Sequence, residues 1–259
     1  MNSIFIPLVV AGMWLGAGST YYVPDAVTET GIRWTYDWSA NPPLYDGVES
    51  VPMLWGVGNV GQSIGGNSEW LMGFNEPDMP GQADITPEDA VKLWFAVEQF
   101  YPERKLVSPG VINLLWLDQW WDAYVAAYGT APRVDAVAMH CYGSWVPDDK
   151  CQRRTDDFVA WARERGIREV WVTEFARQLC YPFGEQGAIE FVEQNVAYWR
   201  TVPEITRVAY FQVTYRGTEP WAFPGSCNTS LVAWDTQQLT AIGRAYAALR
   251  IGPVLSEFD

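Results

Sequence analysis

Two glutamates stand where buried apolar runs of the sequence end. Glu76 closes the run that begins at Trp70, and Glu174 closes the run that begins at Val170, 98 residues later. If both runs are parallel strands of one barrel, their carboxyl ends lie at the same rim and bring the two carboxyl groups together. Such a pair is what glycoside hydrolysis requires: one group protonates the leaving oxygen, and the other attacks the sugar or activates water. Either glutamate alone would equally fit a salt bridge, but the pair favours catalysis.

Other residue types that carry chemistry are scarce. His140 is the only histidine, which excludes metal sites built on two or three histidines, and any Ser-His-Asp triad would have to use it. We expect His140 to orient the site by hydrogen bonding, and we expect no metal and no cofactor. Asp37 and Asp78 are the rival carboxylates. Strand alternation turns Asp37 away from its neighbours and Asp78 lies beyond a strand end, so structural roles are expected for both.

Short apolar runs bounded by turn residues recur along the whole chain and predict the strands that must position these groups. Eight strands are expected, over Ile4–Val10, Ile32–Trp38, Val51–Gly56, Trp70–Asn75, Lys105–Pro109, Val134–His140, Glu169–Phe175 and Arg207–Val213. Helical patterns lie between several of them, after the cap Thr86-Pro87 and over Trp116–Tyr128, Thr155–Arg165, Glu185–Thr201 and Thr236–Arg250.

Eight strands alternating with helices in 259 residues predict a (β/α)₈ TIM barrel, with residues 1–259 as one domain. Residues 39–50 and 57–69 carry no amphipathic run, so loops are expected in place of the second and third helices. A doubly wound sheet is the alternative, because Gly56–Gly61 matches GxGxxG after a strand. The residues that follow are poor helix formers, and the match is therefore interpreted as accidental.

Composition excludes several classes of partner. The chain has 31 acidic and 17 basic residues, a net charge of −14, which argues against nucleic acid. The segment Met1–Ser19 lacks the basic residues of a signal peptide and is too broken by Pro7, Gly12 and Gly16 to cross a membrane, so it is expected to be folded. We expect a monomer without membrane contact. Its acidic surface suits an extracellular or cell-envelope setting.

The four cysteines show no metal-binding spacing. They form no CxxC pair, so a zinc knuckle is not expected. Three pairings into two disulfides are open, as are a single disulfide or none, among Cys141, Cys151, Cys180 and Cys227.

Aromatic residues are abundant, with 15 Trp, 13 Tyr and 11 Phe. Trp94, Trp161 and Trp199 follow helical periodicity and are expected in the core. Sugar rings stack their apolar faces on aromatic rings, so residues at strand ends or in following loops are candidate platforms: Trp34, Trp38, Trp55, Trp145 and Trp221.

The sequence resembles glycoside hydrolase family 128, a family of β-1,3-glucan-active barrels in the retaining clan A. The resemblance runs in order from about Trp34 to Phe211. It rests on five segments: Trp34–Ser39, Val51–Gly56, Gly73–Asp78, Ala138–Gly143 and Trp171–Phe175.

The resemblance implies a role for each matching residue. It implies that Glu76 is the general acid/base and Glu174 the nucleophile. It further implies that Asn75 hydrogen-bonds the sugar 2-hydroxyl and that His140 and Tyr142 line the site around the nucleophile. The sequence departs from the family at two positions: Cys141 replaces a tryptophan, and Tyr210 stands where the eighth strand usually presents a tryptophan to the substrate.

The sequence therefore predicts a retaining endo-β-1,3-glucanase without cofactor that acts on laminarin-like β-1,3-glucans or their oligosaccharides. Three alternatives stay open: a protein that binds these oligosaccharides without turnover, an exo-acting enzyme, and a clan A hydrolase of another β-linkage. Retention requires carboxyl groups about 5–5.5 Å apart, against about 6.5–9.5 Å for inversion. It also requires an ionised Glu174 beside a protonated Glu76, so their environments should push the two pKa values apart.

Overall fold

The computed structural model describes residues 12–21, 23–143, 150–177, 184–215 and 230–250. Eight parallel strands form one sheet in the order β3-β2-β1-β8-β7-β6-β5-β4. Their bounds are β1 Trp14–Gly18, β2 Trp34–Tyr36, β3 Glu49–Ser50, β4 Trp70–Met72, β5 Lys105–Val107, β6 Ala136–Gly143, β7 Glu169–Arg177 and β8 Ile205–Phe211.

The two end strands of this sheet meet and close the barrel. Beyond β3, the backbone amide of Met72 in β4 donates to the carbonyl of Pro52, and the amide of Leu54 donates back to Met72, both at 2.9 Å. Met53 and Met72 thereby form a parallel bridge. The predicted TIM barrel is confirmed.

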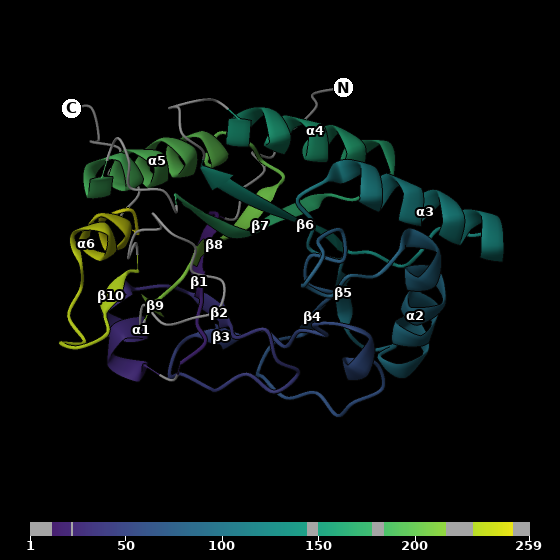
Figure 1. Ribbon diagram of the computed structural model, residues 1–259, viewed down its shortest axis with the longest axis horizontal. Helices are drawn as coiled ribbons and strands as arrows, with labels where there is room; N and C mark the ends of the chain where they lie inside the picture. The colour runs from purple at the N-terminus through teal and green to yellow at the C-terminus, as the bar shows by residue number, and fades with distance from the viewer. Residues whose placement is uncertain (1–11, 22, 144–149, 178–183, 216–229, 251–259) are drawn as a thin grey trace, which may run out of the picture.

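Helices cover most of the outer face of the barrel (Figure 1). They are α1 Pro24–Thr30, α2 Pro87–Phe100, α3 Leu114–Tyr128, α4 Lys150–Glu164, α5 Gly184–Trp199 and α6 Ala241–Ala248. Loops stand where the second and third helices of a regular barrel would lie, as predicted, with one short 3₁₀ turn, Val57–Asn59. A two-stranded sheet, β9 Thr214–Tyr215 and β10 Val232–Ala233, lies outside the barrel sheet. In the described part of the chain, no helix combines the length and apolar character needed to cross a membrane.

Local rules account for several helix ends. The Thr86 hydroxyl accepts a hydrogen bond from the backbone amide of Asp89 at 3.1 Å and so caps α2, while Gly129 ends α3 in the left-handed conformation. Two predicted starts are wrong: α4 begins at Lys150, five residues before Thr155, and α6 begins at Ala241 rather than Thr236.

The first strand corrects the prediction made from the sequence. The expected strand Ile4–Val10 lies outside the described residues, and β1 covers Trp14–Gly18 instead. Its glycines obscure the strand pattern, but the barrel interior requires them. A Cβ on Gly16 would lie 2.3 Å from Nε1 of Trp34, and a Cβ on Gly18 would lie 2.6 Å from the ring of Trp38.

Tryptophans fill the end of the barrel opposite the carboxyl ends of the strands. The guanidinium of Arg207, on β8, lies 4.3 Å from the ring centroid of Trp171 and 5.7 Å from that of Trp34. Its charge is paired with Glu49 at 2.7 Å. Much of the aromatic excess therefore packs the barrel interior around one buried cation. The tryptophans expected in the helix core, Trp94, Trp161 and Trp199, are also buried.

Candidate active site

Glu76 follows β4 at the C-terminal rim, the end of the barrel to which the carboxyl ends of the strands point. Its backbone amide donates to the carbonyl of Gly110 at 2.8 Å, and Asn75 forms a parallel bridge with the same glycine. Glu76 has a backbone φ of 43°. Such a positive φ is unusual for a residue other than glycine and costs about 1–3 kcal/mol. Glu76 is 7% exposed. The strand end therefore holds a strained backbone in order to bury a carboxyl group.

Glu174 lies within β7, where an irregularity turns it into the barrel. Along β6 the register passes from Met139 opposite Val172 to His140 opposite Glu174, so Thr173 is an extra residue in β7. The hydroxyl of Tyr36 donates to the Thr173 carbonyl at 2.7 Å and supports this bulge.

Three hydroxyl or indole groups face the Glu174 carboxylate. Trp38 Nε1 donates to Oε1 at 2.8 Å, the Tyr36 hydroxyl lies 3.4 Å from the same oxygen, and the Tyr142 hydroxyl donates to Oε2. Burial, followed by the charge of Glu174, raises the pKa of both tyrosines well above its usual value. Both tyrosines therefore stay protonated. Tyr142 donates its proton to the carboxylate, whereas Tyr36 donates its single hydroxyl proton to the nearer Thr173 carbonyl.

His140 lies between the two glutamates. Its Nδ1 is 2.9 Å from Glu76 Oε1 and 3.6 Å from Glu174 Oε2, and the imidazole is fully buried. One side-chain oxygen of each glutamate and one nitrogen of His140 lie within 4.8 Å of one another. Among the described residues these three form the one cluster with metal-ligand spacing. The hydrogen bond that joins His140 to Glu76 also accounts for the short distances between these groups.

Burial and neighbouring charges shift the protonation of Glu174 and His140. Burial raises the pKa of the Glu174 carboxyl, and Glu76 adds to the rise, while His140, Tyr142 and Trp38 act in the opposite direction. Burial lowers the pKa of His140, but the charges of Glu174 and Glu76 outweigh it, and the pKa is raised. Glu174 and His140 therefore retain protons more strongly than they would in water, and for Glu174, the carboxyl expected to be ionised, this direction is opposite to the expectation.

Asn75 borders the same cluster and is 3% exposed. Its Nδ2 donates to Gln82 Oε1 at 3.2 Å, and its backbone carbonyl accepts from the amide of Ala83 at 3.1 Å. Among the described residues its Oδ1 has no hydrogen-bond partner. An amide oriented in this way leaves one polar atom for a substrate hydroxyl.

Of the predicted aromatic platforms, only some reach the site. Trp38 lies beside Glu174 and is half-buried, as is Trp55, whose carbonyl accepts from the amide of Asn75 at 2.9 Å. Trp145 and Trp221 lie outside the described residues.

Two predicted contacts are wrong. Trp34 is fully buried deep in the barrel, where its indole donates to the carbonyl of Trp14. Tyr210 is also fully buried, because its ring faces the helices and packs on Phe175 and Tyr246. The interior face of β8 is instead carried by the residues on either side of Tyr210.

The sequence reasoning missed three residues that meet the site or contact one of its residues. Phe211, one position beyond Tyr210, places its ring 5.6 Å from that of Trp38 and 5.8 Å from that of Tyr142. Tyr36 was not singled out as a site residue, although strand alternation with Trp38 would have identified it. Gln82 gave no comparable pattern, because its contact with Asn75 depends on the fold of a loop.

The rival aspartates have structural roles, as expected. Asp37 accepts hydrogen bonds from the backbone and hydroxyl of Ser39 within its own loop. Asp78 accepts from the backbone amides of Ile112 and Asn113, immediately before α3.

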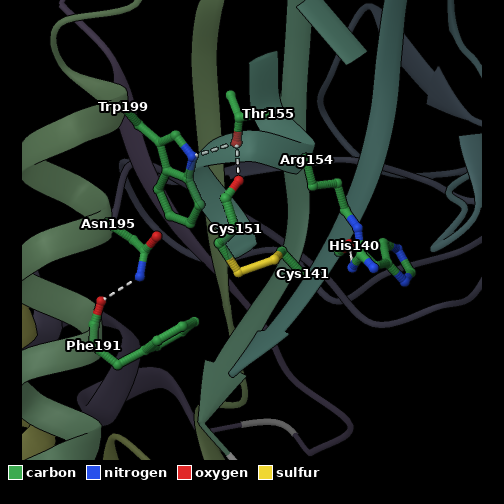
Figure 2. The surroundings of a disulfide bond; sticks show 8 residues. All are labelled: His140, Cys141, Cys151, Arg154, Thr155, Phe191, Asn195 and Trp199. Carbon is green, nitrogen blue, oxygen red and sulfur yellow. Dashed lines mark hydrogen bonds between the residues drawn. A yellow bond between two sulfur atoms is a disulfide. The ribbon is translucent and has the colours of Figure 1, made fainter. Parts of the chain in front are cut away.

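The structure pairs two of the four cysteines. Cys141, directly after His140, forms a disulfide with Cys151 in the first turn of α4 (Figure 2). Cys180 and Cys227 lie outside the described residues.

Comparison with known proteins was made against families, curated sequences and solved structures. The family model described as "Glycosyl hydrolase catalytic core" matches residues 17–246. No curated protein sequence matches the chain.

Solved structures of glycoside hydrolase family 128 resemble the whole barrel. A subgroup I endo-β-1,3-glucanase from Amycolatopsis mediterranei, in complex with laminaritriose, has 27% identity over 92% of this chain and 99% of its own, with a TM-score of 0.73. A subgroup II endo-β-1,3-glucanase from Sorangium cellulosum has 27% identity over 91% and 98%, with a TM-score of 0.72. A subgroup III curdlan-specific exo-β-1,3-glucanase from Blastomyces gilchristii has 25% identity over 90% and 97%, with a TM-score of 0.71.

Proposed function

The chain belongs to the glycosyl hydrolase catalytic core family, and on this premise we propose that it is a retaining endo-β-1,3-glucanase acting on laminarin-like glucans. The observation that carries the proposal is the spacing of the two carboxyl groups, whose nearest oxygens lie within 4.8 Å. This separation suits direct attack on the sugar by one carboxylate. It is shorter than the about 6.5–9.5 Å between the carboxyl groups of an inverting pair, which must hold a water between them.

In the first step Glu174 is the nucleophile and Glu76 the acid. A Glu174 oxygen forms a bond to the anomeric carbon while the bond from that carbon to the leaving oxygen breaks. Glu76 gives its proton to the leaving oxygen. Trp38 and Tyr142 hold the attacking carboxylate in place, and because both only donate to it, they favour its ionised form.

In the second step Glu76 acts as the base. Formation of the glycosyl-enzyme consumes the negative charge of Glu174, so the carboxylate of Glu76 no longer has a charged neighbour on that side. Glu76 takes a proton from water, the water oxygen bonds to the anomeric carbon, and the ester bond to Glu174 breaks. Each group is thereby returned to its starting protonation state.

His140 connects the two carboxyl groups throughout this cycle. Its Nδ1 contacts Glu76 at 2.9 Å and lies 3.6 Å from Glu174, so it is placed to stabilise whichever of them carries the charge. Asn75 supplies the polar atom for the 2-hydroxyl of the bound sugar, where hydrogen bonds strengthen in the transition state.

Internal cleavage is the mode we propose, supported by the two endo-acting relatives described above, which cover nearly the whole chain. The exo-acting relative has the same fold at slightly lower identity. The products therefore decide between the two modes. An endo enzyme releases a ladder of oligosaccharides from laminarin from the earliest times, whereas an exo enzyme releases one small sugar.

The deciding experiment incubates the purified protein with laminarin, β-1,3-gluco-oligosaccharides, cello-oligosaccharides and xylan, and separates the products chromatographically. The proposal expects reducing ends from the β-1,3-linked substrates first. If the protein binds β-1,3-oligosaccharides but releases no products from them, it is a binding protein rather than an enzyme. Faster release of products from cello-oligosaccharides or xylan would show that the enzyme acts on a β-linkage other than β-1,3.

We also propose that the chain works in an oxidising compartment, outside the cell or in its envelope. The buried disulfide between Cys141 and Cys151 supports this location, because such bonds persist where thiols are not kept reduced. Fractionation of the native host, with an antibody against the chain, tests it. Recovery from the cytosol alone would contradict it.

A further inference from the structure

Helix α4 is bonded to strand β6 at two consecutive residues, on the side away from the catalytic pair. Arg154 donates from Nη1 to the backbone carbonyl of His140 at 3.1 Å, and Cys151 is bonded to Cys141 (Figure 2). We propose that Arg154 is a positioning residue of the active site, which sets the place of the His140 imidazole against Glu76. The inference rests on the function proposed above, since it assigns a role in the same reaction.

The strand needs such a support at this point. The register of β6 against β7 shifts between Met139 and His140, where β7 carries Thr173 as an extra residue. The register therefore changes directly before the residue that carries the imidazole, which pairs with Glu174 and donates its amide to the carbonyl of Val111 at 2.9 Å. A hydrogen bond from a guanidinium is stronger than one from a neutral donor. The bond from Arg154 therefore holds the His140 carbonyl firmly against α4.

The imidazole has little room to move when its backbone moves. It is fully buried, and a Cβ on Gly110 would lie 2.8 Å from its Nε2. Among the described residues Nε2 has no hydrogen-bond partner, so Nδ1 is the one ring atom that a polar contact holds. A shift of the His140 backbone is therefore passed on directly to the 2.9 Å contact with Glu76.

Arg154 is itself fixed by the turn on which it stands. One residue further along α4, the Thr155 hydroxyl donates to the carbonyl of Cys151 at 2.7 Å and accepts from Trp199 Nε1 of α5 at 2.9 Å (Figure 2). The disulfide joins the same turn to β6. Arg154 thus donates from a turn that is tied to its surroundings on both sides, which a positioning residue requires.

The variants that test the role are Arg154→Gln, Arg154→Lys and, as the matched control, Arg153→Gln, which changes the exposed neighbouring arginine. We expect Arg154→Gln to lower kcat on laminarin by about 10- to 100-fold, as small misplacements of reacting groups do, with KM within about twofold. The pH dependence of kcat/KM should also change, because the His140 imidazole no longer meets the Glu76 carboxyl in the same place. Arg154→Lys should recover part of kcat, and Arg153→Gln should match the wild type.

A second readout does not depend on catalysis. Because His140 is the only histidine, ¹⁵N-histidine NMR of a protein purified without a histidine tag reports this imidazole alone. We expect its titration midpoint to move in Arg154→Gln and to stay in Arg153→Gln. A wild type without turnover on any glucan would overturn the proposed function but leave this test intact. Unchanged kcat, pH profile and His140 titration in a folded Arg154→Gln variant would overturn the positioning role.

Discussion

His140 Nδ1 lies 2.9 Å from Glu76 Oε1, with the imidazole fully buried and the carboxyl group nearly so. The contact is therefore shielded from bulk solvent. In the proposed cycle, the proton that Glu76 gives to the leaving oxygen and takes from water moves next to His140 and a second carboxylate. Each prediction below tests one consequence of this arrangement.

The two glutamates should respond differently to substitution. On an activated aryl β-glucoside, Glu174→Gln should lose on the order of 10⁵-fold in kcat, as other covalent enzymes do without their nucleophile. Glu76→Ala should lose about 10²–10⁴-fold on laminarin and less on the activated substrate, whose leaving group needs no acid. Added azide should restore turnover to Glu76→Ala alone. Rescue of the Glu174 variant instead would reverse the two roles.

Stability should depend on pH through the buried carboxyl of Glu174. Its pKa is raised in the folded protein by burial, so the stability that this rise contributes is fully present below the unfolded value of about 4.5 and is lost as the pH rises through the folded value. A tenfold change in proton affinity corresponds to about 1.4 kcal/mol. Glu174→Gln should therefore melt increasingly above the wild type from pH 4 to pH 8. A constant difference in Tm would contradict the raised pKa of Glu174.

The hydrogen bond from Trp38 to the nucleophile should matter for rate rather than for folding. Trp38→Phe keeps an aromatic ring beside Phe211 but removes the donor that lies 2.8 Å from Glu174 Oε1. A hydrogen bond to a charged group is worth about 1.5–3 kcal/mol, so kcat should fall about 10- to 100-fold. Trp234→Phe, at an exposed indole, is the control and should be unaffected. Steady-state kinetics and Tm together separate the two effects.

The glycine at the centre of β1 should be essential to the barrel interior. Gly16→Ala would place a Cβ 2.3 Å from the indole of Trp34, and overpacking of this kind costs about 1–3 kcal/mol. Gly58→Ala meets no atom within 4 Å and serves as the control. Urea unfolding followed by tryptophan fluorescence measures both. Equal midpoints for the two variants would show that the interior relaxes around the added methyl group.

Removal of divalent metal should leave the activity unchanged. Glu76, His140 and Glu174 have the spacing of a metal-ligand set, but the proposed mechanism uses their protons and charges directly. Dialysis against EDTA followed by the laminarin assay, with and without added Mg²⁺, Mn²⁺ or Zn²⁺, measures this. Loss of activity on chelation with recovery on one metal would assign the cluster to that ion.

The sequence alone predicted the barrel and placed Glu76 and Glu174, the proposed catalytic pair, at one rim, since both depend on local patterns. Apolar runs bounded by turns identify strands, and the acids that end two of these runs must meet at one rim because parallel strands point the same way. The predictions from the sequence failed for how far some side chains lie along the barrel axis and for the side of the strand to which others point. Trp34, Tyr36 and Trp38 alternate onto one face of the barrel, with ring centroids 5.9 Å and 4.9 Å apart along the series. Tyr36 and Trp38 reach Glu174, but Trp34 does not. How far a residue lies along the barrel axis is a property of the closed sheet.

Tertiary structure decided the details that make the site work. The extra residue Thr173 turns Glu174 inward, and no rule of alternation predicts such a bulge. On β8 a shift of one position assigned the sugar contact to Tyr210, whereas the ring that meets the site is that of Phe211. The pairing of Cys141 with Cys151 and the contact of His140 with Glu76 join segments that only the packing of α4, β6 and the rim brings together. The local sequence determines which strands and helices form. The distances on which proton transfer depends are set by how those elements pack.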